Sequence, residues 1–259
     1  MSSNPRFQTL RVVSALMIRE MITRYGRSVG GYIWAVLEPL GMIAILSIAF
    51  SQFIRTPALG ESFVLFYATG YIPFYMYADV AGNASNAVAF NRSLMQFRMV
   101  TPLDAVFARF FLSVLTVIVV SVVLFSGMGA FGIVEVQVAL SPLLVAFVAA
   151  AALGLGIGTL NAAIFPFFPV WRRIWGIINR PLFLISGVFF TYDSMPANIQ
   201  SILWWNPLVH VIGEARTAFY TIYQPDYISL AYVYGVAFST FLIGASLLIR
   251  HRSFVIENF

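Results

Sequence analysis

Charged side chains lie mainly at the borders of long apolar stretches in this chain. Residues 110–134 and 136–170 contain no charged residue, and four further apolar stretches are separated by arginines, acids and prolines. About 20 residues of apolar helix cross the hydrocarbon core of a membrane. Open sheets are excluded there, because their edges would leave backbone groups without partners. The pattern predicts an all-α polytopic membrane protein with six transmembrane helices, in a single membrane domain over 1–259.

The six predicted spans differ in the clarity of their apolar signal. Glu38-Pro39 interrupts the first span near its start, and Arg180 and Pro181 divide the fifth. After the fifth span come apolar pieces too short to cross, broken by Asn206-Pro207. Such pieces are typical of re-entrant or interfacial helices, which we therefore expect at 193–223, before the last span. The predicted spans are 32–54, 63–90, 106–131, 138–165, 174–192 and 228–249.

The N-terminal residues predict an amphipathic helix over 5–24. Apolar residues recur there at three- and four-residue steps, at Phe7, Leu10, Val13, Met17 and Met21. Arginines run through the whole segment, so it has no continuous apolar core of the kind a signal peptide needs. Such a helix lies in the membrane interface with its arginines toward lipid phosphates; a helix packed on a partner protein is the alternative. The charged residues singled out here are Arg19, Glu20, Arg24 and Arg27.

The arginines also predict the orientation of the chain. All 15 basic residues are arginine, and basic residues gather on the cytoplasmic side of membrane proteins. If the N-terminus is cytoplasmic, 13 of the 15 lie on that side and only Arg55 and Arg216 lie outside. Both termini are therefore expected in the cytoplasm, and the 193–223 segment on the opposite side. Orientation accounts for the net charge of +5 better than a nucleic-acid partner, which we do not expect.

Missing residue types exclude several kinds of chemistry. A nucleotide-binding P-loop needs its lysine, and the sequence has no lysine, so an ATP-driven motor would have to lie on another chain. There is no cysteine and there are two histidines, too few for a dedicated zinc site. No serine or cysteine nucleophile stands at a recognised spacing. We expect no catalytic residue, no metal site and no cofactor in this chain.

The second predicted span is crowded with aromatic residues. Three tyrosines recur at helical spacing, and a tyrosine hydroxyl inside a membrane needs a partner. A channel for a sugar chain would use such residues, because rings stack on sugar C–H faces and hydroxyls bond sugar hydroxyls. Packing between helices is the alternative. The candidate channel residues are Trp34, Tyr67, Tyr71, Phe74 and Tyr75.

Two acids, Glu38 and Asp79, fall inside predicted spans. Intramembrane acids are costly and are by default functional candidates. They would suit a proton relay. The alternative is that Glu38 lies near the cytoplasmic interface and pairs with an arginine.

Two connecting segments carry further candidates. The polar, basic segment 91–104 is either a docking element for a cytosolic partner or an ordinary loop, and Thr101-Pro102 followed by Asp104 predicts a helix start. Its candidate residues are Arg92, Arg98, Thr101, Pro102 and Asp104. In the 193–223 segment, tryptophans favour the outer membrane interface. The candidates for a periplasmic gate there are Trp204, Trp205, Asn206, Pro207, His210 and Arg216.

Five short motifs in order give the chain a family resemblance. It resembles the inner-membrane permease of capsular polysaccharide exporters, an ABC-2 type transporter subunit, over nearly its whole length. The motifs are Arg19-Glu20 with Arg24-Tyr25-Gly26-Arg27, Gly31-Tyr32-Ile33-Trp34-Ala35-Val36-Leu37-Glu38-Pro39, Gly70-Tyr71-Ile72-Pro73-Phe74, Thr101-Pro102-Leu103-Asp104, and Trp205-Asn206-Pro207-Leu208-Val209-His210.

The resemblance implies a single ABC-2 type transmembrane domain in the bacterial inner membrane. It implies a homodimer with two cytosolic ABC ATPase subunits that bind ATP and Mg, and a coupling helix within 91–104. The substrate would be a lipid-linked acidic polysaccharide, passed to a periplasmic co-polymerase and an outer-membrane channel. The alternatives are an ABC-2 permease for O-antigen or teichoic-acid polymers, a drug-efflux permease, and a proton-coupled carrier that uses Glu38 and Asp79.

Overall fold

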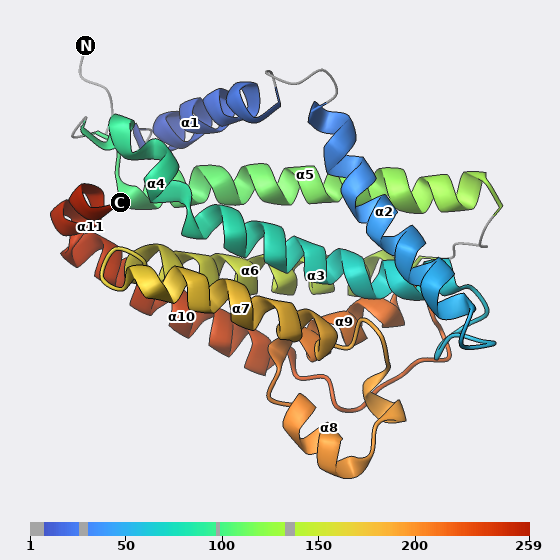
Figure 1. Ribbon diagram of the computed structural model, residues 1–259. Coiled ribbons are helices and arrows are strands. Elements are labelled where there is room, and N and C mark those ends of the chain that lie inside the picture. The colour runs from blue at the N-terminus through green and yellow to red at the C-terminus, as the bar shows by residue number, and fades with distance from the viewer. Residues whose placement is uncertain (1–7, 26–30, 97–98, 133–137) are drawn as a thin grey trace.

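A computed structural model describes residues 8–25, 31–96, 99–132 and 138–259, and every regular element within them is helical (Figure 1). The expected all-α architecture is therefore confirmed for this part of the chain. The elements are α1 (Gln8–Tyr25), α2 (Gly31–Ser51), α3 (Phe63–Ser85), α4 (Ala87–Asn91), η2 (Arg92–Gln96), α5 (Pro102–Ala130), α6 (Leu140–Ile164), α7 (Pro169–Leu184), η3 (Tyr192–Ser194), α8 (Ala197–Leu203), α9 (Pro207–Thr217), α10 (Leu230–Arg250) and α11 (Arg252–Asn258).

Four of the described helices, α2, α5, α6 and α10, are long and apolar enough to cross a membrane. The 23-residue α3 is also long, but tyrosines and Asp79 dilute its apolar character, and most of its side chains are buried against other helices. The 16-residue α7 carries three arginines, and none of its side chains is buried. The chain is thus a polytopic helical membrane protein, with α3 largely buried inside it.

Three helices differ most in their bounds from the expected spans. The helix expected over 63–90 breaks at Asn86, whose side chain donates a hydrogen bond back to the carbonyl of Gly82 at 2.9 Å. α5 begins at Pro102, earlier than the predicted 106. α7 covers Pro169–Leu184 rather than 174–192, because a proline starts it and the chain turns after Leu184 through Gly187, whose φ is +90°.

α6 lies at the centre of the packing and contacts α3 on one side and α10 on the other. Glycines make the close approach possible. A Cβ on Gly158 would lie 2.6 Å from the Cβ of Ala84 on the α3 side, and one on Gly156 would overlap the carbonyl of Ala237 on α10. Small residues at such interfaces let helix backbones meet and replace the hydrophobic drive that lipid does not supply.

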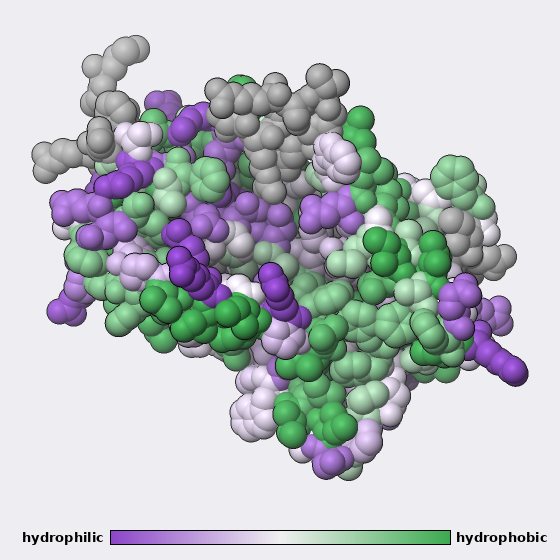
Figure 2. All heavy atoms as spheres, in the orientation of Figure 1, coloured by the Kyte–Doolittle hydropathy of each residue, from purple (hydrophilic) through white to green (hydrophobic). Residues whose placement is uncertain are grey.

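The bundle has two distinct ends. At one, α4, α11 and the start of α5 lie together; α9 and the 52–62 connection lie toward the other, where α8 projects from the bundle (Figure 1). We call them the α11 end and the α8 end. On the face shown in Figure 2, hydrophilic residues gather over the α11 end and hydrophobic residues over the middle of the bundle.

Candidate functional site

Helix α1 packs against α5 at the α11 end of the bundle. Val13, Leu16 and Glu20 are buried, whereas Ile18 and Ile22 are 60% and 65% exposed. The helix therefore presents one face to the bundle and leaves apolar side chains on another. Arg27 and Phe7 lie outside the described residues, as does the side chain of Arg24.

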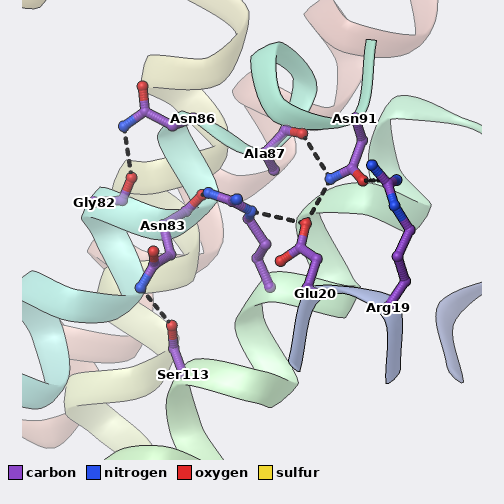
Figure 3. A network of polar contacts seen from close by, with 9 residues as sticks. Arg19, Glu20, Gly82, Asn83, Asn86, Ala87, Asn91 and Ser113 are labelled. Carbon is purple, nitrogen blue, oxygen red and sulfur yellow. Dashed lines mark hydrogen bonds and ion pairs between the residues drawn. The ribbon is translucent and has the colours of Figure 1, made fainter. Parts of the chain in front are cut away.

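The buried Glu20 is the centre of a polar network between three parts of the fold (Figure 3). Its Oε1 accepts a hydrogen bond from Arg109 Nε on α5 at 3.0 Å and one from Asn91 Nδ2 on α4 at 2.6 Å. Charge-assisted hydrogen bonds of this kind are about twice as strong as neutral ones. Glu20 thus fastens the N-terminal helix to both α4 and α5.

Neighbouring side chains extend this network. Arg19 Nη1 donates to the amide oxygen of Asn91 at 3.2 Å, so Asn91 joins two successive residues of α1 (Figure 3). Asn83 on α3 donates to Ser113 on α5 at 2.8 Å, and the Arg109 guanidinium lies 4.1 Å from the ring centre of Phe90. These contacts therefore connect a movement of α4 to α1, α3 and α5.

The start of α5 is fixed by a capping box. The Thr101 hydroxyl accepts from the backbone N–H of Asp104 at 3.2 Å, and the Asp104 carboxylate accepts from the backbone N–H of Thr101 at 2.8 Å. Pro102 occupies the first turn, where its missing N–H costs nothing. The predicted helix start is confirmed. Asp104 is buried, and its carboxylate fixes the backbone at the start of α5. Arg98 lies outside the described residues.

The structure brings four of the five channel candidates together on α3. Tyr67, Tyr71 and Phe74 are buried, Tyr75 is half-buried, and the rings of Tyr71 and Tyr75 are stacked with centres 5.8 Å apart. Aromatic rings from α2, from the end of α7 and from the segment that follows α7 complete the cluster. The ring centres of Phe50 and Phe189 lie 5.4 and 6.3 Å from that of Tyr67. The ring centre of Phe183 lies 4.9 Å from that of Phe74.

Trp34 and the two acids lie apart from this cluster. Trp34 is 67% exposed on α2, and Glu38 is exposed one turn further along. Asp79 is half-buried on α3. Trp34 and Glu38 are therefore open to an outside partner, whereas the aromatic cluster is packed inside the chain.

At the α8 end, His210 joins three segments of the chain. It is fully buried; its Nε2 lies 2.7 Å from the Trp204 carbonyl and its Nδ1 accepts from the backbone N–H of Ser229 at 3.1 Å. This arrangement requires a neutral ring with its proton on Nε2. Burial lowers the pKa of His210, which favours the same neutral form.

The surrounding residues reinforce this connection. The Trp204 ring stacks on Tyr232 with centres 5.1 Å apart and meets the Trp205 ring edge-on. The Asn206 side chain caps α9, accepting from the backbone N–H of Leu208 at 3.1 Å, and Pro207 follows in the first turn. These contacts join α9 to the segments on either side of it, although the Trp205 side chain is itself 68% exposed.

Arg216 is a second buried brace at this end. It is 2% exposed, donates to the carbonyls of Phe190 at 2.8 Å and Val188 at 3.1 Å, and lies 4.3 Å from the ring centre of Phe66. Burial lowers the pKa of Arg216 to about 10, so it remains charged at neutral pH. It ties the chain after α7 to α9 and α3.

Sequence reasoning missed Asn83, Asn91 and Ser113 as members of the network, and it counted Arg109 only for orientation. The sequence did contain one signal for this network. Glu20 is the single acid among the N-terminal arginines, and an isolated acid on a helix usually pairs with a basic or amide side chain. Within the described ranges, no three His, Cys, Asp or Glu side chains come together as a metal-binding group.

Comparison with known proteins agrees with this helical membrane architecture. The chain is 31% identical to the polysialic acid transport protein KpsM of Escherichia coli, over 91% of each protein. It is 29% identical to the capsule polysaccharide export inner-membrane protein BexB of Haemophilus influenzae, over 90% of this chain and 88% of that protein. It is 29% identical to the corresponding CtrC protein of Neisseria meningitidis serogroup A, over 85% of each.

A more distant relative is the O-antigen export system permease protein RfbA of Klebsiella pneumoniae, 24% identical over 84% of this chain and 83% of that protein. Residues 11–220, from α1 through the braced α9, match the ABC-2 type transporter family. With this match and relatives that align almost end to end, the chain belongs to the ABC-2 type transporter family.

Proposed function

We propose that the chain is the membrane subunit of an ATP-driven exporter that moves lipid-linked capsular polysaccharide from cytoplasm to periplasm. The observation that carries the proposal is the near end-to-end similarity to several proteins named for polysialic acid transport or capsule polysaccharide export. The chain would lie in the bacterial inner membrane. It would cross six times, with α3 and α7 added to the four apolar helices, and the 193–223 segment would re-enter from the periplasm.

The α11 end is the proposed cytoplasmic face. Most arginines belong to the elements at this end or to residues next to those elements in the sequence, as expected for a cytoplasmic side. ATP and Mg would be bound by two copies of a separate ATPase, because a P-loop requires a lysine and this chain has none. The ATPase would dock on 91–104, and the network around Glu20 would carry its motion to α1, α3 and α5.

The transport path would form between two copies of the chain. Trp34 and Glu38 are exposed on α2, where a second copy or the polymer can reach them. The stacked pair Tyr71 and Tyr75 would line the path once α2 or α7 moves aside. Arginine side chains suit an acidic polymer, since they bind carboxylates and phosphates in bidentate fashion. A periplasmic co-polymerase and an outer-membrane channel would receive the polymer.

Deletion of the gene in its host tests this function. We expect surface polysaccharide to disappear while lipid-linked acidic polymer accumulates inside the cell, and a plasmid copy to restore export. If surface acidic polysaccharide is unchanged and O-antigen is lost instead, the substrate assignment is wrong. Loss of a small-ion or proton-driven uptake activity, abolished by Glu38→Gln with Asp79→Asn, would indicate a carrier.

A further inference from the structure

The C-terminal helix α11 is tied to the 91–104 segment by a hydrogen bond to its own main chain. Arg92, the first residue of η2, donates from Nη2 to the carbonyl oxygen of Glu257 at 2.7 Å. The two residues are 165 positions apart in the sequence. In Figure 1 the red α11 lies at the same end of the bundle as α4.

A second hydrogen bond runs in the opposite direction. Arg252, at the start of α11, donates from Nη2 to the carbonyl oxygen of Val100 at 2.9 Å. We call the 91–104 segment the coupling region. One bond therefore holds Arg92, near its beginning, and the other holds Val100, just before the Thr101 cap. Both acceptors are backbone carbonyls, so the bonds fix the course of the main chain and do not depend on the acceptor's side chain.

Apolar and aromatic contacts seat α11 between two loops. Val255 is fully buried in a cluster that includes Val88 and Met95 from the α4–η2 side. The Phe254 ring stacks on Phe167 in the α6–α7 connection, with centres 4.7 Å apart. The helix thus contacts the described parts of the α4–α5 connection, 92–96 and 99–101, and the 165–168 connection at this end of the bundle.

We propose that α11 is a clamp that holds both described ends of the coupling region, 92–96 and 99–101, in the shape that the ATPase recognises. The proposal rests on the proposed function, since it assigns a position to the docking element of that exporter. Arg92 and Arg252 are positioning residues in this account. A docking element that is fixed in advance binds more tightly than one that must be ordered on binding, and it transmits movement to the bundle without bending first.

Arg252→Gln in the full chain, embedded in lipid nanodiscs, is the direct test, with its ATPase as the probe. If the clamp holds the competent shape for most of the time, its loss should weaken ATPase binding about fivefold, because the apparent affinity falls with the competent fraction. The thermal stability of the permease alone should stay within the range of the control. Arg252→Lys, which keeps the positive charge and an N–H donor group, should recover most of the affinity.

Arg250→Gln is the matched control, because Arg250 is an exposed arginine two residues away and the substitution removes the same charge. Glu257→Ala is a second control, since it keeps the carbonyl that Arg92 uses. Both should bind the ATPase as the wild type does. Removal of 253–259 should weaken binding, and Arg92→Met should add little in that truncated chain, because the shared bond is already gone.

The outcomes separate this proposal from the function on which it rests. If wild-type chain does not bind an ATPase, the proposed function fails. If wild type binds and Arg252→Gln binds equally well, or Arg250→Gln weakens binding as much, the clamp is wrong and the exporter assignment stands. Additive effects of Arg92→Met and the truncation would likewise contradict the clamp, since they would show that Arg92 acts on the ATPase independently.

Discussion

Glu20 and Arg109 form an ion pair in which Oε1 of the carboxylate lies 3.0 Å from Nε of the guanidinium, across 89 residues of sequence. Their side chains are 10% and 12% exposed. An ion pair removed from water is favourable only when other hydrogen bonds complete it, and Asn91 supplies one to the same carboxylate. The pair therefore fixes the N-terminal helix on the membrane domain at the place where the ATPase is proposed to act.

Glu20→Gln should destabilise the chain and reduce export. The variant leaves the half-buried Arg109 without its countercharge, and because Arg109 is partly exposed the cost should be below that of breaking a fully buried pair, about 3–5 kcal/mol. Thermal unfolding in detergent and surface polysaccharide measure the two effects. Arg11→Gln, at an exposed position of the same helix, serves as control and should change little. Glu20→Gln combined with Arg109→Met should lose less than the two single losses together; strictly additive losses would mean that the pair does not act as a unit.

Replacing the stacked tyrosines should separate transport from folding. Tyr71→Leu with Tyr75→Leu keeps apolar volume on α3 but removes two ring faces and two hydroxyls from the proposed path. We expect export to fall strongly while the chain still folds and reaches the membrane, although replacing two packed rings with smaller side chains lowers thermal stability. Tyr71→Phe with Tyr75→Phe, which keeps the rings, should retain more export. Normal surface capsule in the leucine variant would rule out these residues as the lining.

Acid should weaken the joint at His210. Burial lowers the pKa of His210 from its usual 6.5. Just below pH 6.5 the ring therefore stays neutral in the folded chain but binds a proton in the unfolded chain. Stability is therefore complete above about pH 6.5 and decreases as the pH falls below that value. Thermal unfolding between pH 7.5 and 5.5 measures the loss. His210→Gln, which can donate and accept but does not titrate, should show a shallower pH dependence; equal slopes would contradict this role.

The glycine contact between α6 and α10 should tolerate no side chain. Gly156→Ala would place a Cβ against the carbonyl of Ala237 and force the helices apart, at a cost of about 1–3 kcal/mol. The midpoint of thermal unfolding in detergent reports this loss. Gly235→Ala on α10, where nothing lies within 4 Å of the added atom, is the control and should be neutral or slightly stabilising. Equal behaviour of the two variants would be inconsistent with the packing described.

The features that sequence predicts well depend on local chemistry. Long uncharged stretches required helices because lipid offers no partner for backbone groups. The start of α5 followed from Thr101, Pro102 and Asp104, whose side chains act within one helical turn. The break at Asn86 was missed, because its side-chain bond to Gly82 competes with a helix that the apolar pattern alone would continue.

The features that sequence did not predict depend on contacts between distant residues. The partners of Glu20 lie 71 and 89 positions away, and nothing in their spacing reveals the meeting. Arg216 bonds to two backbone carbonyls, which every residue possesses and which therefore leave no mark in the sequence. For this reason the buried hydrogen bonds of Arg216 and His210 could not be predicted from the sequence, and their role in a periplasmic gate stays a prediction.

Purification of the tagged chain from membranes, with ATPase activity assayed in the eluate, tests the central claim most directly. We expect a stoichiometric partner that contains a P-loop, with ATP hydrolysis that chelation of Mg abolishes. A Glu20→Gln preparation should contain less of the partner. A stable chain that purifies alone from cells expressing its whole gene cluster, with no hydrolysis in the eluate, would contradict the assignment to an ATP-driven exporter.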